Sequence, residues 1–388
     1  MGDSKMVRLA EVLAENPDAL KEAEDKELAR KNSITARIKS IYQLGEANWW
    51  MADSIKPREA LLRYPGDDNK LMMPRGEVCS LVGSDGVGKS RILTQLCLSI
   101  ATGSHFLDTY IPEAPGRVLY ICGEEDDEEI KRRLFYAIKD ANLQKSEMIK
   151  LIGKNFRSLS QKGRDTRLQT NDLSESDIAK ELLQAATVIA EKDGLALVVL
   201  DPMSWFAGND TEKDSIAATQ FSRICQKFTE ICGHPTVLIC HHTGKAAQKD
   251  SKETEDASTT DMRGSSGLSA AFRFGINIVK LKSPKGEAWR GQTYLKFLVK
   301  KNNYGPEDHE GIMLRVAHPG VVKKMSEKEI EAFDAARNID NEAVHPKADG
   351  RFGKGNKRVA SVANDKGRSD YRSAKNEEKF DERTNGRP

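Results

Sequence analysis

The sequence predicts an α/β fold with a mainly parallel central sheet flanked by helices, an antiparallel C-terminal extension and a helical N-terminal segment. Short, continuously apolar runs alternate with amphipathic stretches between residues 76 and 240, which is typical of parallel strands buried on both faces. Three later apolar runs, at 276–281, 293–300 and 311–316, are joined by short turns. Short connections favour antiparallel pairing, because parallel neighbours need a long crossover.

Each predicted parallel strand is a short apolar run, and the four runs lie at 78–82, 117–122, 195–200 and 236–240. The stretches between them place apolar residues at helical spacing, so helices are predicted within 92–100, 130–138, 178–189 and 221–232. Upstream, residues 46–75 contain Pro57, Pro65 and Pro74 and are predicted to form an irregular lead-in.

Composition excludes several classes of protein. The 61 Lys and Arg residues nearly balance the 59 Asp and Glu residues, so a globally basic nucleic-acid-binding surface is not indicated. No apolar run is long enough to span a membrane, and the first residues lack the apolar core of a signal peptide. We therefore expect a cytoplasmic protein with no membrane partner. The six cysteines form no Cys-x-x-Cys pair, and we interpret them as reduced core residues rather than metal ligands or disulfides.

Residues 83–90 read GSDGVGKS, which matches the phosphate-binding pattern GxxxxGK[ST] between a predicted strand and a predicted helix. Glycines let backbone N–H groups close around phosphate oxygens, and the helix directs its positive end at them. Lys89 is expected to reach the β- and γ-phosphates, and the Ser90 hydroxyl to bind Mg²⁺. The predicted ATP-binding residues of this segment are Gly83, Ser84, Asp85, Gly86, Val87, Gly88, Lys89, Ser90 and Arg91.

Two carboxylates are predicted to complete this site. Asp201 follows the apolar run 195–200, where the end of a parallel strand would face the nucleotide, and it is expected to hold Mg²⁺ through water. Hydrolysis also needs a carboxylate that orients or deprotonates water, and the residue after Asp201 is Pro202. The acidic run after strand 117–122 supplies candidates, with Glu124 the first choice and Glu125 the second. The later acids of that run suit the start of the next helix.

The apolar run 236–240 leads into His241-His242-Thr243-Gly244-Lys245. A polar residue at the end of a central strand beside Asp201 could contact the γ-phosphate or its attacking water and report the nucleotide state. His241 is the preferred sensor, and a purely structural histidine is the alternative. A metal site is less favoured, because adjacent histidines point in different directions and no carboxylate follows at a zinc spacing.

The long polar segment 246–267 that follows contains no aromatic residue on which a base could stack. This segment and the residue before it nevertheless contain four basic residues that could contact a phosphate backbone, namely Lys245, Lys249, Lys252 and Arg263. An exposed loop without a partner is the alternative interpretation.

Several motifs together resemble those of RecA-like ATPases of the plasmid RepA replicative-helicase type, within the hexameric helicase and recombinase superfamily. In chain order they are MPRGEVCSLVGSDGVGKS, GRVLYICGEEDDEEIKRRL, LALVVLDPMSWFAGND, VLICHHTGK, MRGSSGLSAAFR and VKKNNYG. The resemblance covers about residues 56–318 and implies a RecA-like P-loop NTPase core. It further implies a ring of six subunits, with ATP between subunits and single-stranded DNA in the central channel.

The resemblance also assigns roles to individual residues. Glu124 corresponds to the catalytic glutamate and His241 to the sensor. Arg273 corresponds to an arginine that acts on the neighbouring subunit's nucleotide, and Arg263 is the alternative. For each of these two arginines, a purely structural ion pair is a further interpretation. The late motif has Asn303 where the ring helicases of bacterial chromosomes carry a second cation, so that second trans cation is in doubt.

The resemblance places channel loops after two strands, at roughly 207–215 and 244–266 in this chain. The first of these contains Lys213 as its one basic residue. The assignment of DNA binding therefore depends mainly on the resemblance.

We predict four regions along the chain. Residues 1–55 form a helical segment whose apolar stripe packs on the main domain or on an adjacent subunit. Residues 56–325 form the RecA-like ATPase domain, and residues 326–340 form a short helical connector. Residues 341–388 hold 12 basic and 8 acidic residues with almost no large aliphatic side chains, which predicts a disordered tail. The tail is a solvated spacer or a weak tether for nucleic acid or replication proteins.

The expected function is an ATP-dependent single-stranded DNA translocase or replicative helicase that works as a ring, with ATP and Mg²⁺ as cofactors. The 5′-to-3′ direction of movement follows from the resemblance alone, and the compact architecture suggests a phage or plasmid source. The main alternative is a RecA-like regulatory or recombination-mediator ATPase that does not unwind DNA. A nucleotide-binding scaffold without hydrolysis is disfavoured by Glu124, Asp201 and the histidine pair.

Overall fold

The structure is a computed structural model that describes residues 57–344, except 67–69, 192, 209–210, 244–265 and 318, together with six single positions between 25 and 38. The predicted helical segment 1–55 therefore lies almost wholly outside the described residues. Arg263, most of the segment 246–267 and the tail beyond residue 344 also lie outside the described residues. The chain separates into two compact units, Met1–Asn338 and Ile339–Pro388. The sheets and the candidate site belong to the first unit.

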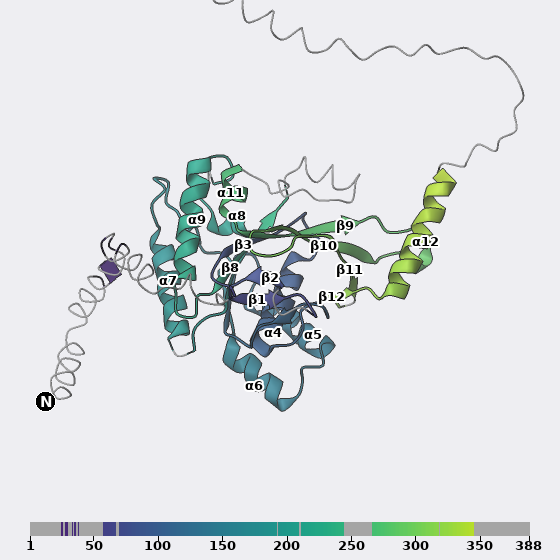
Figure 1. Ribbon diagram of the computed structural model, residues 1–388, viewed down its shortest axis with the longest axis horizontal. Helices are drawn as coiled ribbons and strands as arrows, with labels where there is room; N and C mark the ends of the chain where they lie inside the picture. Colours follow the sequence, from purple (N-terminus) through teal and green to yellow (C-terminus); the bar gives the residue numbers. More distant parts are fainter. Residues whose placement is uncertain are drawn as a thin grey trace, which may run out of the picture. The chain divides into compact units, whose positions relative to one another are not determined.

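A nine-stranded sheet with the order β12-β11-β10-β9-β3-β8-β7-β5-β6 forms the core (Figure 1). Six neighbouring strands run parallel, and their bounds are β9 (Phe274–Leu281), β3 (Val78–Gly83), β8 (Thr236–His242), β7 (Leu197–Asp201), β5 (Val118–Cys122) and β6 (Phe156–Ser160). β10 (Thr293–Asn302), β11 (Asp308–Ala317) and β12 (Val321–Lys324) add antiparallel pairs at the β9 edge. The predicted mainly parallel sheet with an antiparallel extension is confirmed.

Helices cover both faces of this sheet (Figure 1). One face packs against α4 (Lys89–Thr102), α5 (Asp127–Asp140) and α6 (Ser146–Asn155). The other packs against α7 (Asp177–Ala190), α8 (Met203–Phe206), α9 (Ser215–Thr229) and α11 (Ser266–Ala271). Because successive side chains of a strand point to opposite faces, Leu238 and Cys240 of β8 join the first cluster while Val237 and Ile239 join the second.

The predicted irregular lead-in is wrong for its described part. β1 (Ala60–Arg63), β2 (Leu71–Pro74) and β4 (Ile111–Pro112) form a separate antiparallel sheet of three strands. The prolines do not prevent it, because Pro65 lies in the turn after β1 and Pro74 ends β2. The Asn302 side-chain amide donates to the carbonyls of Leu71 and Met72 at 3.2 Å, which connects this sheet to the end of β10.

The antiparallel extension ends in helix α12 (Glu327–Val344), which continues four residues beyond the predicted connector 326–340. Ser326 and Glu329 begin this helix with reciprocal hydrogen bonds, since the Ser326 backbone N–H donates to the Glu329 carboxylate at 2.8 Å and the Glu329 N–H donates to the Ser326 hydroxyl. Phe333 packs with Leu281, Tyr294 and Met325, near the short 3₁₀ helix η2 (Glu287–Trp289). Among the described residues, none of the helices is long and apolar enough to cross a membrane.

Candidate nucleotide-binding and hydrolysis site

Four parallel strands bring the predicted site residues to one edge of the sheet. β8 lies between β3 and β7, and β5 lies on the other side of β7. In the register of these pairs, Gly83 is opposite His242, and Asp201 is opposite Cys122. The phosphate loop, Asp201 and the acidic run after β5 therefore all leave the sheet at the carboxyl ends of neighbouring strands, which is where open α/β sheets bind ligands.

The phosphate loop turns sharply between β3 and α4. Gly88 has φ 89° and precedes the first residue of α4, and no side chain caps the helix there. The free N–H groups of the first helical turn are consequently available to an anion, and the positive end of the helix dipole favours one. At the other end of the loop, a Cβ on Gly83 would lie 3.1 Å from the Ile278 carbonyl oxygen and from Val87 Cγ2. The loop and the adjacent strand β9 thus pack too closely for a larger residue.

Lys89 is folded back over the loop that precedes it. Its side chain is nearly buried, and Nζ donates to the carbonyl oxygens of Gly83 and Ser84 at 2.9 Å each. Nζ also lies 3.2 Å from Nδ1 of His242, which forms an ion pair with Asp85 as well. The ammonium group is therefore held inside the curve of the loop, where phosphate oxygens would replace its carbonyl partners.

The two histidines of β8 lie on opposite faces of the sheet. Strand β8 continues to His242, so His241 is inside the strand rather than the first residue beyond it. His241 is fully buried and has the parity of Val237 and Ile239, which pack toward α9. His242 has the parity of Leu238 and Cys240, on the α4 face. The histidine that contacts the phosphate loop is consequently His242, whereas sequence reasoning preferred His241.

Asp201 is buried at the end of β7, with 2% of its surface exposed. Its Oδ2 accepts a hydrogen bond of 2.7 Å from the hydroxyl of Tyr120 on β5. Burial and the nearby Asp201 carboxylate raise the pKa of Tyr120 well above its ordinary value, so this hydroxyl keeps its proton. The Asp201 carboxylate is thus held by a hydrogen bond from the uncharged hydroxyl of Tyr120 on β5.

Three cysteines, Cys97, Cys122 and Cys240, also surround Asp201. Burial raises the pKa of all three thiols, and the Asp201 charge raises it further. In the metal-free protein these thiols are therefore protonated and uncharged. Five of the six cysteines are buried free thiols, as predicted, while Cys232 is exposed.

The oxygen donors fit Mg²⁺ better than a metal that prefers thiolate or imidazole. Ser90 contributes a hydroxyl at the start of α4, and Asp201 contributes a carboxylate at the end of β7. No group of three or more His, Cys, Asp and Glu side chains among the described residues is arranged to hold a metal ion by itself. Mg²⁺ commonly takes one or two protein oxygens and completes its shell with water and phosphate oxygens, which agrees with this donor set.

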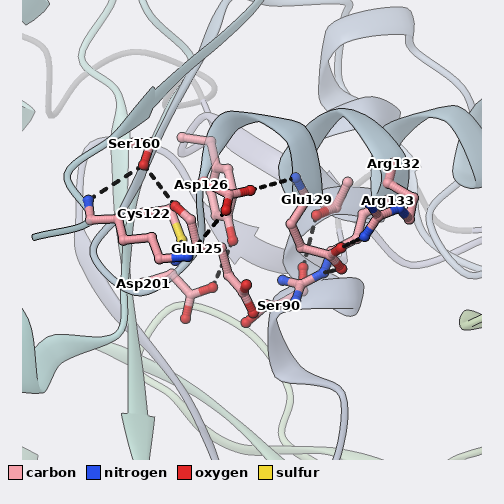
Figure 2. Close-up of polar contacts among 12 residues, drawn as sticks. Ser90, Cys122, Glu125, Asp126, Glu129, Arg132, Arg133, Ser160 and Asp201 are labelled. Atoms are coloured by element: carbon pink, nitrogen blue, oxygen red, sulfur yellow. Dashed lines mark hydrogen bonds and ion pairs between the residues drawn. The ribbon is translucent and has the colours of Figure 1, made fainter.

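Ion pairs occupy most of the acidic run after β5 (Figure 2). Arg133 donates to Glu125 at 2.5 Å and to Glu129 at 3.0 Å. Asp126 caps α5 by accepting from the Glu129 backbone N–H at 3.0 Å, and it pairs with Lys162 at 3.1 Å. These contacts hold the pKa of Asp126 below its ordinary value. As expected for most of the run, these acids stabilise the start of a helix.

Glu124 differs from its neighbours in the run. Its side chain is exposed at the end of β5, and Oε1 accepts a hydrogen bond of 3.2 Å from the indole nitrogen of Trp205. It forms no ion pair with any residue that the structure describes. Of the two candidates for orienting water, Glu125 is thus engaged by a guanidinium group and Glu124 by a neutral donor.

A cleft at the start of α4 brings the predicted residue Arg91 together with residues that no sequence motif indicated. Arg91 and Gly320 lie against each other, since a Cβ on Gly320 would be 3.0 Å from Arg91 Cζ. The other residues that line the cleft come from α4, α5 and the turn before β12, and they include Thr94, Gln95, Arg132, Arg133 and Tyr136. The Lys-Arg-Arg sequence at 131–133 was the available signal, but its spacing alone does not show which side chain faces the loop.

Arg273 lies at the opposite end of the sheet from the phosphate loop. Its backbone N–H donates to the carbonyl of Val78, the first residue of β3, at 3.3 Å. Gly83 is the fifth residue after Val78 in β3, which corresponds to roughly 16 Å along a strand. Lys301 is nearby on β10, and burial together with the charge of Arg273 lowers the pKa of Lys301. Neither cation is therefore placed to reach the nucleotide of its own chain.

Comparison with protein families assigns the part of the chain that carries the phosphate loop. The family model described as an AAA domain matches residues 43–248, which is more than half of the chain and includes the phosphate loop, Glu124 and Asp201. Comparison with curated proteins gives no match. The mainly parallel sheet, the phosphate loop before α4 and Asp201 at the end of β7 agree with the family assignment. The chain therefore belongs to this AAA-domain family and is a P-loop ATPase.

Proposed function

We propose that this ATPase is a single-stranded DNA translocase of the replicative-helicase type, which works as a ring of identical subunits. The observation that carries the proposal is the separation of two sets of groups. The phosphate loop, Asp201 and Glu124 lie at one end of the parallel strands, whereas Arg273 and Lys301 lie at the other end. A cation so placed can act on phosphate only when another subunit docks against it.

Within one subunit, the residues divide the work of hydrolysis. Lys89 exchanges its carbonyl partners for phosphate oxygens, and the N–H groups at the start of α4 bind the same phosphates. Ser90 and Asp201 would hold Mg²⁺, which neutralises charge on the phosphates when it is bound. Glu124 accepts a proton from the attacking water or orients it, because its carboxylate is exposed and has no cationic partner among the described residues.

Between subunits, Arg273 completes the site. A guanidinium group from the neighbour would add positive charge to the transferring phosphoryl group only in the docked state, which links hydrolysis to assembly. Lys301 lies near Arg273 on β10, where burial and the Arg273 charge lower the pKa of the Lys301 ammonium group. This arrangement supports an assembly of subunits, and the response of the ATPase activity to DNA separates the translocase from the regulatory or recombination-mediator ATPase.

Complementation between two inactive variants tests the proposal. Lys89→Ala removes nucleotide contacts but leaves Arg273, whereas Arg273→Ala leaves the phosphate loop intact. We expect each variant alone to lose ATPase activity and a mixture of the two to recover part of it, because some sites then combine an intact loop with an intact neighbour. A mixture as inactive as its components would contradict action between subunits.

The DNA part of the proposal needs a separate measurement. We expect steady-state ATPase activity to rise on addition of single-stranded DNA and the stimulation to weaken as salt increases, because phosphate contacts release counterions. An unwinding assay on a forked duplex then distinguishes a helicase from a translocase that does not separate strands. Hydrolysis that is indifferent to DNA would instead favour the regulatory or recombination-mediator ATPase.

A further inference from the structure

Trp205 lies beside Glu124, the carboxylate proposed to orient the attacking water. It belongs to α8, which begins two residues after Asp201, and its indole is partly buried against the core cluster on the α9 face of the sheet. The indole nitrogen donates to Oε1 of Glu124 at 3.2 Å. The segment that follows Asp201 thus returns to touch the glutamate at the end of the neighbouring strand.

Gly123 allows this contact. A Cβ at position 123 would lie 2.7 Å from both Cβ and Cγ of Trp205, so any larger residue would push the indole away. The Gly123 backbone N–H also donates to the Asp201 carbonyl at 2.9 Å, which holds the ends of β5 and β7 together. The indole therefore packs directly on the backbone that carries Glu124.

Hydrogen bonds to two of its carbonyl groups also hold the backbone of α8. The Trp205 carbonyl accepts from the Thr166 hydroxyl at 2.5 Å, and the Phe206 carbonyl accepts from the Leu168 backbone N–H at 2.8 Å. These bonds fix the backbone of the short helix to the segment after β6. The indole nitrogen consequently presents its proton to Glu124 from a restrained position.

The nature of the donor matters for hydrolysis. Arg133 neutralises Glu125 and Glu129, and Lys162 pairs with Asp126. An indole N–H is a donor only and carries no charge, so it can orient a carboxylate without cancelling the negative charge that attracts a proton. We propose that Trp205 is a positioning residue for Glu124, which holds the carboxylate in the orientation that hydrolysis needs. The inference rests on the proposed role of Glu124 in ATP hydrolysis.

Trp205→Phe is the test, because it removes the N–H while it keeps an aromatic ring against Gly123 and the core. We expect kcat to fall about 10-fold, the effect of losing a hydrogen bond to a charged group. The KM for ATP should change by less than about twofold, since the indole contacts the glutamate and not the phosphate loop. Trp289→Phe is the matched control, because Trp289 packs on Tyr294 and Phe333 in the antiparallel extension. It should leave both constants unchanged.

Tryptophan emission supplies a second readout, which tests whether the Trp205 indole contacts the Glu124 carboxylate in solution. Glu124→Ala should shift the emission of the otherwise unaltered chain, because the carboxylate beside the indole is lost. The same substitution made in the Trp205→Phe chain should leave the emission of the remaining tryptophans unchanged. An identical shift in both backgrounds would overturn the inference.

The outcomes separate this inference from the proposed function. If Glu124→Gln is inactive while Trp205→Phe turns over like the unaltered chain, the role of Trp205 is overturned and the role of Glu124 stands. If Glu124→Gln keeps full turnover, the proposed role of Glu124 fails and the inference fails with it. If Trp205→Phe loses ATP binding or thermal stability in parallel with turnover, Trp205 is structural and the inference is overturned.

Discussion

The ammonium nitrogen of Lys89 lies 3.2 Å from Nδ1 of His242, and the same ring nitrogen pairs with Asp85. The two contacts need different forms of the ring, because Nδ1 accepts from Lys89 only without a proton and donates to Asp85 only with one. His242 therefore has two alternative partners within the phosphate loop. His242 is the last residue of β8, so its side chain connects the phosphate loop to this strand.

Substitutions of the two adjacent histidines should have different consequences. We expect His242→Ala to lower kcat/KM for ATP about 10-fold, because Lys89 and Asp85 both lose a partner. His241→Ala should instead lower the free energy of unfolding by about 2 kcal/mol, because it empties a fully buried position. Urea unfolding and steady-state kinetics on both variants check this. Equal losses of activity at equal stability would contradict the assignment of the two faces.

Glu124→Gln and Glu125→Gln form a second matched pair. Glu124→Gln should reduce turnover at least about 100-fold while ATP binding is retained, because an amide cannot accept the proton of the attacking water. Glu125→Gln should reduce turnover only a few-fold, since Glu125 pairs with Arg133 at 2.5 Å. The measurements are steady-state ATPase rates and binding of a fluorescent ATP analogue. A larger loss of turnover in Glu125→Gln than in Glu124→Gln would show that Glu125, and not Glu124, orients the attacking water.

Two buried tyrosines provide a test of the Asp201 environment. Tyr120→Phe removes the 2.7 Å hydrogen bond to Asp201 and should cost about 2 kcal/mol of unfolding free energy, since it leaves a buried carboxylate without that donor. Tyr110 is equally buried, and its hydroxyl has no hydrogen-bond partner among the described residues. Tyr110→Phe should therefore be neutral or slightly stabilising. Urea unfolding of both variants measures the difference, and an equal cost would contradict the importance of the Tyr120 bond.

Thr211 anchors the segment that follows α8. Its buried hydroxyl donates to Gln169 Oε1 at 2.9 Å, and Gln169 Nε2 donates to the Ala217 carbonyl at 2.9 Å. Thr211→Val keeps the shape but removes the donor, so we expect about 1 kcal/mol of destabilisation and faster tryptic cleavage after Lys213. Thr219→Val is the control, because the exposed Thr219 hydroxyl bonds to the Ser215 carbonyl within its own helix, α9. Unchanged cleavage in Thr211→Val would show that this bond does not restrain the segment.

Much of the fold was predictable because its signals are local. A strand buried on both faces must be apolar throughout, so β3, β5, β7 and β8 were visible as runs, and helical periodicity located α4, α5, α7 and α9. The prediction failed at β1 and β2, because two four-residue strands near prolines carry too little pattern to be separated from an irregular segment.

The chain's sequence settled the chemistry of the phosphate loop, because glycine conformations, a lysine and a hydroxyl at set spacing suffice to describe it. The folded chain settled the rest through contacts between distant residues. The parity of β8 determines that His242 meets Lys89. Arg133 engages Glu125 from eight residues away, and Trp205, which follows β7, reaches Glu124 at the end of the neighbouring strand β5. Arg273 is positioned by its pairing with Val78, far from its own phosphate loop. These contacts depend on which strands are neighbours and on which face of the sheet each side chain lies. A local sequence pattern does not determine which strands become neighbours.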